Sequence, residues 1–157
     1  MNLTLLTVGK TDGGWIADAI DTYVSRLSHY AKFSIVEIPA VKVASSWTPE
    51  ALKAKEGEAI LSKVKPSDEV ILLDERGRQY GSVEFAKLLE DKMARSGRDI
   101  VFVVGGAFGF SEAVYSRADS KLSLSKMTFT HQMVRLFFTE QLYRAFTIIR
   151  HEPYHNE

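Results

Sequence analysis

The C-terminal tail of the chain carries side chains that can bind a base or move a proton. Residues 151–157 contain two histidines, one tyrosine and one proline. A histidine with an ordinary pKa of about 6.5 exchanges protons at neutral pH, and a tyrosine can stack on a base or donate a hydrogen bond. Chain ends are usually frayed, but Pro153 and the apolar stretch before it predict a docked tail. Tyr154 and His155 are therefore candidates for substrate chemistry.

The apolar stretch before this tail contains charged residues that need an explanation. Residues 131–149 have the pattern of a helix with very little polar face, so it must be covered nearly all round. A small domain supplies one covering layer, and we expect a second copy of the chain to supply the other. Arg135, Glu140 and Arg144 lie within this helix. Charges in such a setting either pair across an interface or line a site, and both interpretations remain open.

A glycine-rich turn directly follows the most apolar strand that the sequence predicts. Residues 100–104 are all apolar, and Gly105, Gly106 and Gly109 come next. Glycines let backbone N–H groups approach a ligand without a Cβ in the way, and a helix that begins at Ser111 adds a positive dipole end. A cofactor cradle and a simple tight connection are equally good interpretations. The full Gly-x-Gly-x-x-Gly and Gly-Lys-Ser/Thr patterns are missing, which disfavours dinucleotide and P-loop sites.

Two other segments have the chemistry of a nucleoside pocket. Asp74 ends the apolar strand at 69–74, where an acid can bind a ribose or a metal or simply cap a turn, and Leu73 beside it is either core or a pocket wall. Residues 125–131 alternate polar and apolar side chains before a helix. Their backbone could bracket an adenine edge while Met127 and Phe129 pack on its face. An ordinary edge strand is the alternative, and the nearby glycine turn favours the pocket.

The elements that position these segments alternate between strands and helices. Strands are predicted at 2–8, 33–38, 69–74, 100–104 and 121–127, and helices at 15–27, 49–64, 82–96, after Ser111 and at 131–149. Residues 40–47 are predicted as a loop and residues 76–78 as a turn, with Thr48 and Ser82 as helix caps. The alternation predicts one α/β domain over 1–157 with a mainly parallel sheet. Ligands bind beyond the carboxyl ends of such strands, so residues 74–78, 105–110 and 125–131 should converge.

Composition narrows the class of protein. The chain has 157 residues, 45% of them hydrophobic, a net charge of zero and no cysteine. Without cysteine, disulfides and thiolate metal sites are excluded, and a reducing cytoplasm is the expected location. We expect neither a signal peptide nor a membrane span. Because the chain is neutral, attraction to nucleic acid must come from a local patch, from shape or from a second subunit.

Five motifs follow one another along the chain. They are Leu72-Leu73-Asp74, Val104-Gly105-Gly106-x-x-Gly109, Ser123-Leu124-Ser125-x-Met127-Thr128-x-x-His131, Glu140-Gln141-Leu142-Tyr143-Arg144-Ala145 and Pro153-Tyr154-His155. In order and spacing, and over essentially the whole chain, they resemble the RlmH branch of the SPOUT methyltransferases. The resemblance implies a C-terminal trefoil knot that binds S-adenosylmethionine, and a homodimer. It also implies methylation of N3 of a pseudouridine in large-subunit (23S) ribosomal RNA within the ribosome, without a metal or a membrane partner.

The same resemblance implies roles for individual residues. The cofactor-binding residues would be Leu73, Gly105, Gly106, Ser125, Lys126, Met127, Thr128, Phe129 and Thr130. Catalytic and substrate roles would fall to His131, Glu140, Arg144, Tyr154 and His155, and the tail is a candidate to complete the partner's site. The chain departs from the family pattern at three positions. Ala107 and Thr130 replace prolines, and Asn156 replaces an arginine that could contact a phosphate.

The implied reaction is a direct methyl transfer from an already activated sulfonium. The protein then has to align N3 and help remove its proton. We assign His155, or a water that it orders, to the proton, and Arg144 to the charge that develops on the pyrimidine oxygens. One alternative is a Rossmann-like oxidoreductase, which needs an acid about twenty residues after its glycines, and Asp119 is too close. A non-enzymatic α/β RNA-binding module with Asp74 as a receiver-like acid would need neither the 125–131 segment nor the tail.

Overall fold

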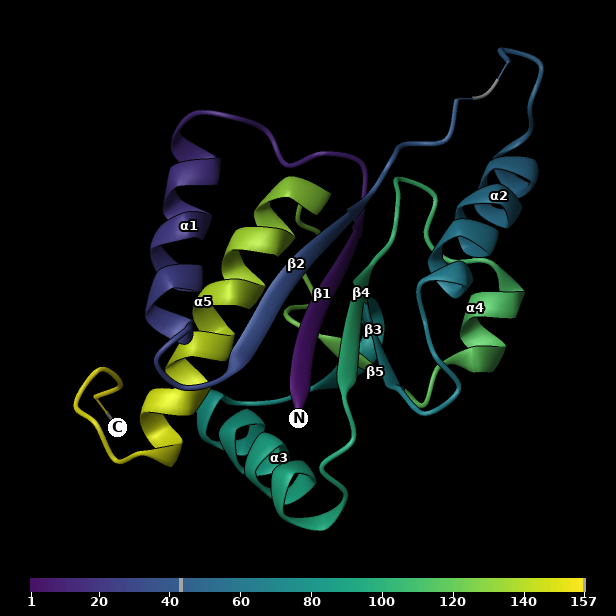
Figure 1. Ribbon diagram of the computed structural model, residues 1–157. Helices are drawn as coiled ribbons and strands as arrows, with labels where there is room; N and C mark the ends of the chain where they lie inside the picture. Colours follow the sequence, from purple (N-terminus) through teal and green to yellow (C-terminus); the bar gives the residue numbers. More distant parts are fainter. Residues whose placement is uncertain (43, 157) are drawn as a thin grey trace.

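The computed structural model describes residues 1–42 and 44–156 (Figure 1). Val43, inside the expected loop at 40–47, and Glu157, the last residue of the tail, lie outside the described residues. The strands are β1 (Asn2–Val8), β2 (Lys32–Ile38), β3 (Glu69–Gln79), β4 (Ile100–Val104) and β5 (Ser120–Ser123). The helices are α1 (Trp15–Leu27), α2 (Pro49–Ser62), α3 (Ser82–Arg95), α4 (Glu112–Arg117) and α5 (His131–Ile149).

The strands form one sheet in the order β2-β1-β4-β3-β5, and each pair of neighbours is parallel. This confirms the predicted α/β class. Every residue of β4 is buried, as expected of a strand covered on both faces. Helices α1, α3 and α5 cover one face, and α2 and α4 cover the other (Figure 1). The trefoil knot that the resemblance implies stays a prediction.

Two boundaries predicted around β3 and β5 are wrong. The expected turn at 76–78 is part of β3, whose register shifts between Leu73 and Arg78 before Arg78 pairs with Leu122. A Cβ on Gly77 would lie 2.6 Å from the backbone nitrogen of Leu122, so this glycine allows two strands to approach closely. The Arg-Gly-Arg pattern resembles a turn, but the contact that decides its structure comes from a distant strand.

The fifth strand is shorter than predicted. It ends at Ser123, and residues 124–130 form a loop rather than the end of a strand. The Ser123 hydroxyl donates to the backbone oxygen of Ser125 at 2.9 Å, and the Ser125 hydroxyl accepts from the backbone nitrogen of Met127 at 2.9 Å. Serine side chains that bond to nearby backbone favour turns over strands. The alternating pattern of this segment therefore marks a loop.

Helix starts follow local chemistry in most places. The Thr48 hydroxyl accepts from the backbone nitrogen of Ala51 at 3.1 Å, and Pro49 is the first residue of α2, as predicted. The expected cap at Ser82 is wrong by one position. Gly81 is the N-cap of α3, and its backbone nitrogen donates to the Glu84 carboxylate at 2.9 Å.

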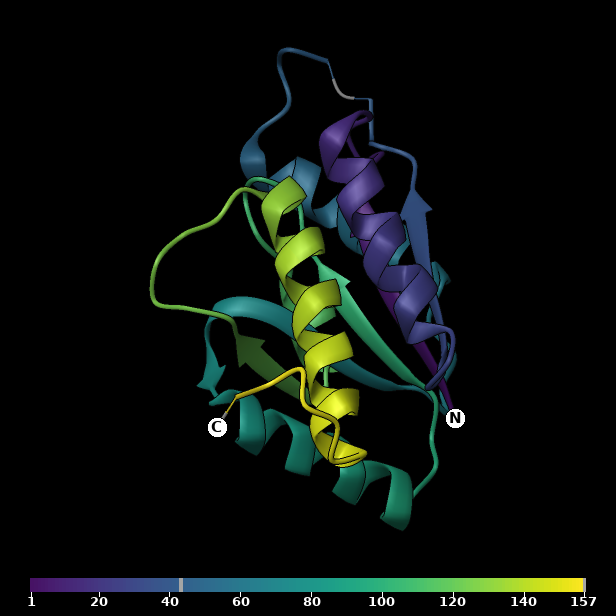
Figure 2. The same cartoon turned by 90° about the vertical axis from the view of Figure 1, so that its left-hand side faces the viewer.

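Helix α5 lies against the sheet between α1 and α3 (Figure 2). Its Arg135 side chain is fully buried and donates to the backbone oxygens of Val8 at 2.9 Å and Gly9 at 3.0 Å. It also donates to the Thr11 hydroxyl at 3.0 Å, and the Glu37 carboxylate lies 3.6 Å away. Burial lowers the pKa of the Arg135 guanidinium, and Glu37 opposes this shift. This charge is therefore paired inside one chain and joins α5 to the end of β1.

Replacing Arg135 with methionine should destabilise the fold by about 3 kcal/mol, because buried backbone oxygens lose charged donors. Thermal and urea unfolding measure the change. Arg95→Met serves as the control, since Arg95 is exposed at the end of α3. A loss for Arg135→Met no larger than that of the control would contradict the anchoring role.

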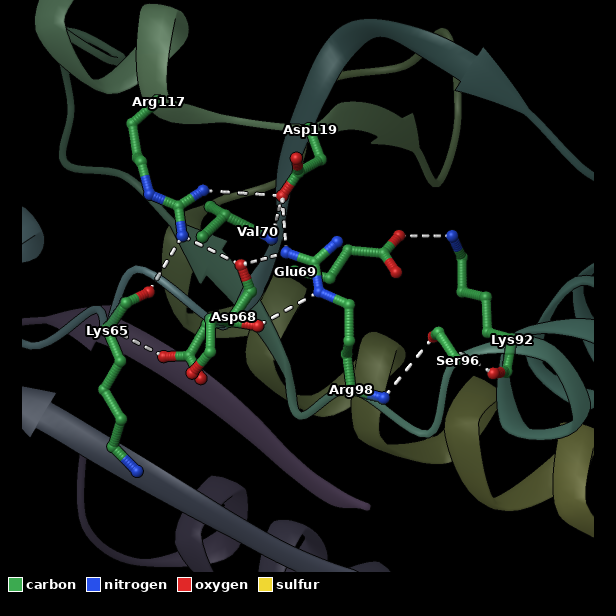
Figure 3. Close-up of polar contacts among 10 residues, drawn as sticks. Lys65, Asp68, Glu69, Val70, Lys92, Ser96, Arg98, Arg117 and Asp119 are labelled. Carbon is green, nitrogen blue, oxygen red and sulfur yellow. Dashed lines mark hydrogen bonds and ion pairs between the residues drawn. The ribbon is translucent and has the colours of Figure 1, made fainter.

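The amino ends of the strands are closed by a polar network (Figure 3). Arg98 and Arg117 each donate to the backbone oxygen of Asp68 at 2.8 Å. The Asp119 carboxylate accepts from the backbone nitrogen of Val70 at 2.8 Å and lies 3.4 Å from Arg117. These bonds hold the starts of β3, β4 and β5 together. The carboxyl ends of the strands lie at the opposite edge of the sheet, which is where ligands bind in parallel sheets.

Candidate functional site

A cavity of about 630 Å³ lies beside residues 73–76 of β3, where β4 and β5 end. The three segments expected to converge there do so. Leu73, the glycine turn after β4 and the loop after β5 all line the cavity, and the first turn of α5 closes one side. The volume is within the range of pockets that hold small-molecule cofactors.

The cavity contains nearly all of the predicted cofactor residues. The members that line it are Leu73, Gly105, Gly106, Ser125, Met127, Thr128, Phe129 and Thr130. Lys126 is exposed and does not line it. His131, which was assigned to the substrate, also lies at the cavity rather than with the tail.

The glycines of the turn are explained by close contacts with neighbouring side chains and by backbone conformation. A Cβ on Gly105 would lie 3.0 Å from the Phe110 ring, and a Cβ on Gly106 would lie 2.5 Å from a Glu56 carboxylate oxygen. Gly109 has a φ of 84°, a conformation that favours glycine, and its nitrogen donates to the Gly106 oxygen at 3.1 Å. The turn is thus a tight connection, as one interpretation held, and it also forms part of the cavity wall.

Asp74 performs the capping role that the sequence left open, and it also lines the cavity. Its carboxylate accepts from the backbone nitrogen of Arg76 at 2.9 Å and from the Tyr115 hydroxyl. Burial, together with this hydrogen bond, raises the pKa of Tyr115 to about 12. The Thr128 hydroxyl donates to the Glu75 carboxylate at 3.1 Å, which ties the loop after β5 to β3.

Several cavity residues were missed by the sequence analysis. Lys53 comes from α2, Tyr115 from α4 and Val134 from α5. Each of them reaches the cavity from a helix. A helical pattern shows which residues are apolar or charged, but it does not show which of them will face a cavity formed by other segments.

The tail is docked, as predicted, and the surface it docks on is α5 of the same chain (Figure 2). His151 has a φ of 56° and turns the chain at the end of the helix. The Tyr30 hydroxyl donates to the Glu152 carboxylate at 2.5 Å, which fixes the turn. The Tyr154 ring then packs on Tyr143, with ring centroids 4.7 Å apart.

The docked tail completes a four-residue polar cluster, which we call the tail cluster: Glu140, Arg144, Tyr154 and His155. The Glu140 carboxylate accepts from Arg144 at 2.6 Å and from the Tyr154 hydroxyl at 2.8 Å. Arg144 lies over the Tyr154 ring, 4.8 Å from its centroid. Burial raises the pKa of Tyr154, as do its hydrogen bonds to Tyr23 and Glu140. Tyr154 therefore acts as a neutral hydrogen-bond donor.

His155 is joined to the rest of the cluster through Arg144. A guanidinium nitrogen of Arg144 lies 3.0 Å from His155 Nδ1. Arginine can only donate hydrogen bonds, so Nδ1 must be the acceptor.

The tail cluster and the cavity are separate groups within one chain. His131 at the cavity and Glu140 in the cluster are both on α5, and nine residues of helix between them correspond to about 13 Å along the axis. None of the four cluster residues lines the cavity. A single chain thus brings together the predicted cofactor residues and, at a distance, the predicted catalytic ones.

Over residues 1–42 and 44–156, no group of three or more His, Asp or Glu side chains is arranged to hold a metal ion. In the same part of the chain, no helix is both long and apolar enough to cross a membrane.

Comparison with known proteins gives a match over almost the whole length. A family model described as "Predicted SPOUT methyltransferase" matches residues 1–155. A protein from Porphyromonas gingivalis named "Ribosomal RNA large subunit methyltransferase H" is 52% identical over 157 residues, which is 100% of both chains. A protein of the same name from Christiangramia forsetii is 53% identical over 156 residues, or 99% of each chain. Among solved structures, a ribosomal RNA small subunit methyltransferase E from Neisseria gonorrhoeae, bound to S-adenosyl methionine, is similar with a TM-score of 0.46 and 16% identity, covering 90% of this chain and 65% of the other.

Proposed function

The chain belongs to the SPOUT methyltransferase family, and we propose that it transfers a methyl group from S-adenosylmethionine to large-subunit ribosomal RNA. The observation that carries the proposal is the convergence of residues 73–76 of β3 and the segments after β4 and β5 on one cavity. The finer proposal is that the target is N3 of a pseudouridine in the assembled ribosome, and that the active form is a homodimer in the cytoplasm. Membership in a methyltransferase family leaves no support for the oxidoreductase or the non-enzymatic RNA-binding module.

The residues around the cavity fit this cofactor. Leu73, Leu122 and Val134 supply apolar walls for a flat ring. Asp74 and Glu75 line the same cavity and carry negative charge, which suits a sulfonium and an ammonium group. Lys53 offers a positive charge to a carboxylate. When bound, S-adenosylmethionine would supply the activated methyl group, so the protein needs no further group to activate it.

The tail cluster is suited to the other half of the reaction. Glu140 holds Arg144 in place through the 2.6 Å ion pair. We propose that Arg144 shifts from His155 Nδ1 to a pyrimidine oxygen when RNA binds, and stabilises the negative charge that develops there. The same shift would leave Nδ1 able to accept the N3 proton, directly or through a water. Tyr154 holds the tail on Glu140 during this exchange.

A homodimer would bring the two groups together. Large apolar side chains are exposed near the cavity, and Met127 is 75%, Phe108 53% and Phe137 39% exposed. Exposed apolar surface of this kind is typical of an interface. In a two-fold dimer with the two copies of α5 antiparallel, the tail of one chain would approach the cavity of the other. This supports the earlier expectation that a second copy covers the outer face of α5.

The cofactor proposal predicts selective stabilisation by ligand. S-adenosylhomocysteine at about 100 times its dissociation constant should stabilise the protein by about 2.7 kcal/mol, which raises the melting temperature by about 5–10 °C. NAD and Mg²⁺ at equal concentrations are the controls and should give no shift. Two results would contradict a methyltransferase pocket. One is a shift of the melting temperature with NAD but not with S-adenosylhomocysteine, and the other is no shift with either ligand.

The substrate proposal is tested with labelled S-adenosylmethionine and ribosomes lacking the modification. Digestion to nucleosides should place the label in an N3-methylated pseudouridine. Label in another nucleoside would contradict the proposed target atom but not the methyltransferase activity. Free ribosomal RNA is tested in parallel, and label that appears only in that RNA would contradict the proposal that the ribosome is the substrate.

A further inference from the structure

A buried carboxyl group lies behind the glycine turn, and the mechanism above does not use it. Glu56 on α2 is only 8% exposed. Its Oε1 is buried and makes no hydrogen bond with the described part of the chain. Burial raises the pKa of this carboxyl group. Keeping an acceptor buried without a partner costs stability, so such a group calls for a reason.

Glu56 presses directly on the cavity wall from outside the cavity. A Cβ on Gly106 would lie 2.5 Å from Glu56 Oε2 and 2.6 Å from Oε1. Gly106 lines the cavity, whereas Glu56 does not. Gly106 does not have a positive φ, so its backbone would accept another residue. A side chain at position 106 would therefore meet the Glu56 carboxyl group, and either that group or the turn would have to move.

The next residue of α2 makes a second close contact with the far end of the same turn. A Cβ on Gly57 would overlap the Ser111 hydroxyl and would lie 3.3 Å from a Val114 methyl carbon. Ser111 is the N-cap of α4 and accepts from the backbone nitrogen of Val114 at 3.4 Å. Helix α2 is therefore seated against both ends of the turn, at Gly106 and at Ser111.

We infer that Glu56 is a positioning residue for the cofactor: its carboxyl group sets how far Gly106 projects into the cavity. The inference rests on the proposed function, because it assumes that S-adenosylmethionine occupies this cavity. It assigns to α2 a role in cofactor affinity that the three strand-end segments alone do not explain.

A double-mutant cycle on the purified full-length protein tests the inference. Gly106→Ala should raise the dissociation constant for S-adenosylhomocysteine at least about tenfold, because the added methyl group meets the carboxyl group and displaces the turn. Glu56→Ala should raise it about threefold to tenfold, since the turn loses its support. In the Glu56→Ala background, Gly106→Ala should cost nothing further. Glu56→Gln keeps the shape and should stay within about threefold of wild type.

Glu58→Ala is the matched control, because Glu58 is on the same helix with a side chain that is 71% exposed. It should leave affinity unchanged and should not relieve Gly106→Ala. Calorimetric titration well below the melting temperatures separates affinity from folding, and a purely structural role would lower melting temperatures while leaving the dissociation constants unchanged. Wild-type protein that fails to bind overturns the proposed function and this inference together. Binding by wild type with additive effects of the two substitutions overturns this inference only. If Gly106→Ala does not fold, a Glu56→Ala affinity equal to that of Glu58→Ala also overturns it.

Discussion

Replacing His155 with alanine is expected to lower the rate of methyl transfer by about 10²- to 10³-fold, because the substrate loses its proton acceptor. Affinity for S-adenosylhomocysteine should not change, since His155 does not line the cavity. Single-turnover transfer to ribosomes measures the first quantity, and calorimetric titration measures the second. The separation of the two effects follows from the separation of the tail cluster from the cavity.

A second histidine of the tail provides the control. His151 is exposed and has a φ of 56°, a conformation that asparagine adopts readily. His151→Asn should therefore keep both turnover and affinity. If His155→Ala turns over as fast as this control, the histidine has no part in the proton transfer.

Mixing two inactive variants is expected to restore activity if the tail of one chain serves the cavity of its partner. Thr128→Trp fills the cavity from an exposed position, and His155→Ala disables the tail. After subunit exchange, half of the dimers are mixed and one of their two sites is intact, so about one quarter of the wild-type rate should return. Each variant alone should stay nearly inactive.

The control for this experiment is a double variant with both substitutions in one chain. Mixed with wild type, it contributes no intact cavity and no intact tail, and mixed with either single variant it should restore nothing. Failure of the two single variants to restore activity would mean that each tail serves the cavity of its own chain. That result would leave the cofactor pocket in place and remove the proposed dimer from the mechanism.

Much of the fold was predictable because hydrophobic periodicity is strong in this chain. Residues 2–8, 100–104 and 131–149 were predicted with the bounds that the structure shows. The misses have two causes, a long-range contact in one case and local bonds from side chains to the backbone in the other. Gly77 sits in a strand because the Leu122 backbone passes close to it, and the loop after Ser123 is shaped by hydroxyl groups that bond to nearby backbone.

The candidate site divides in the same way. Parallel strands end at one edge of the sheet, so the convergence of Leu73, the glycine turn and the loop after β5 follows from topology. The reason for a glycine at position 106 does not follow, because Glu56 is 50 residues away from Gly106 along the chain. The pairing of Arg135 with the end of β1 could not be predicted either. A helical pattern does not indicate which backbone oxygens will accept hydrogen bonds from a buried guanidinium.

Helix α5 is one continuous rod that has Thr130 and His131 of the cavity at its start and supports the docked tail on its second half. If the reaction needs the start of α5 in one subunit beside the second half of α5 in its partner, a single subunit can bind its ligand and still be inactive. Specific activity would then fall on dilution, with a second-order dependence on enzyme concentration once the pairs come apart. An enzyme built this way has no catalytic power before assembly, so nascent or scarce chains could not modify RNA prematurely.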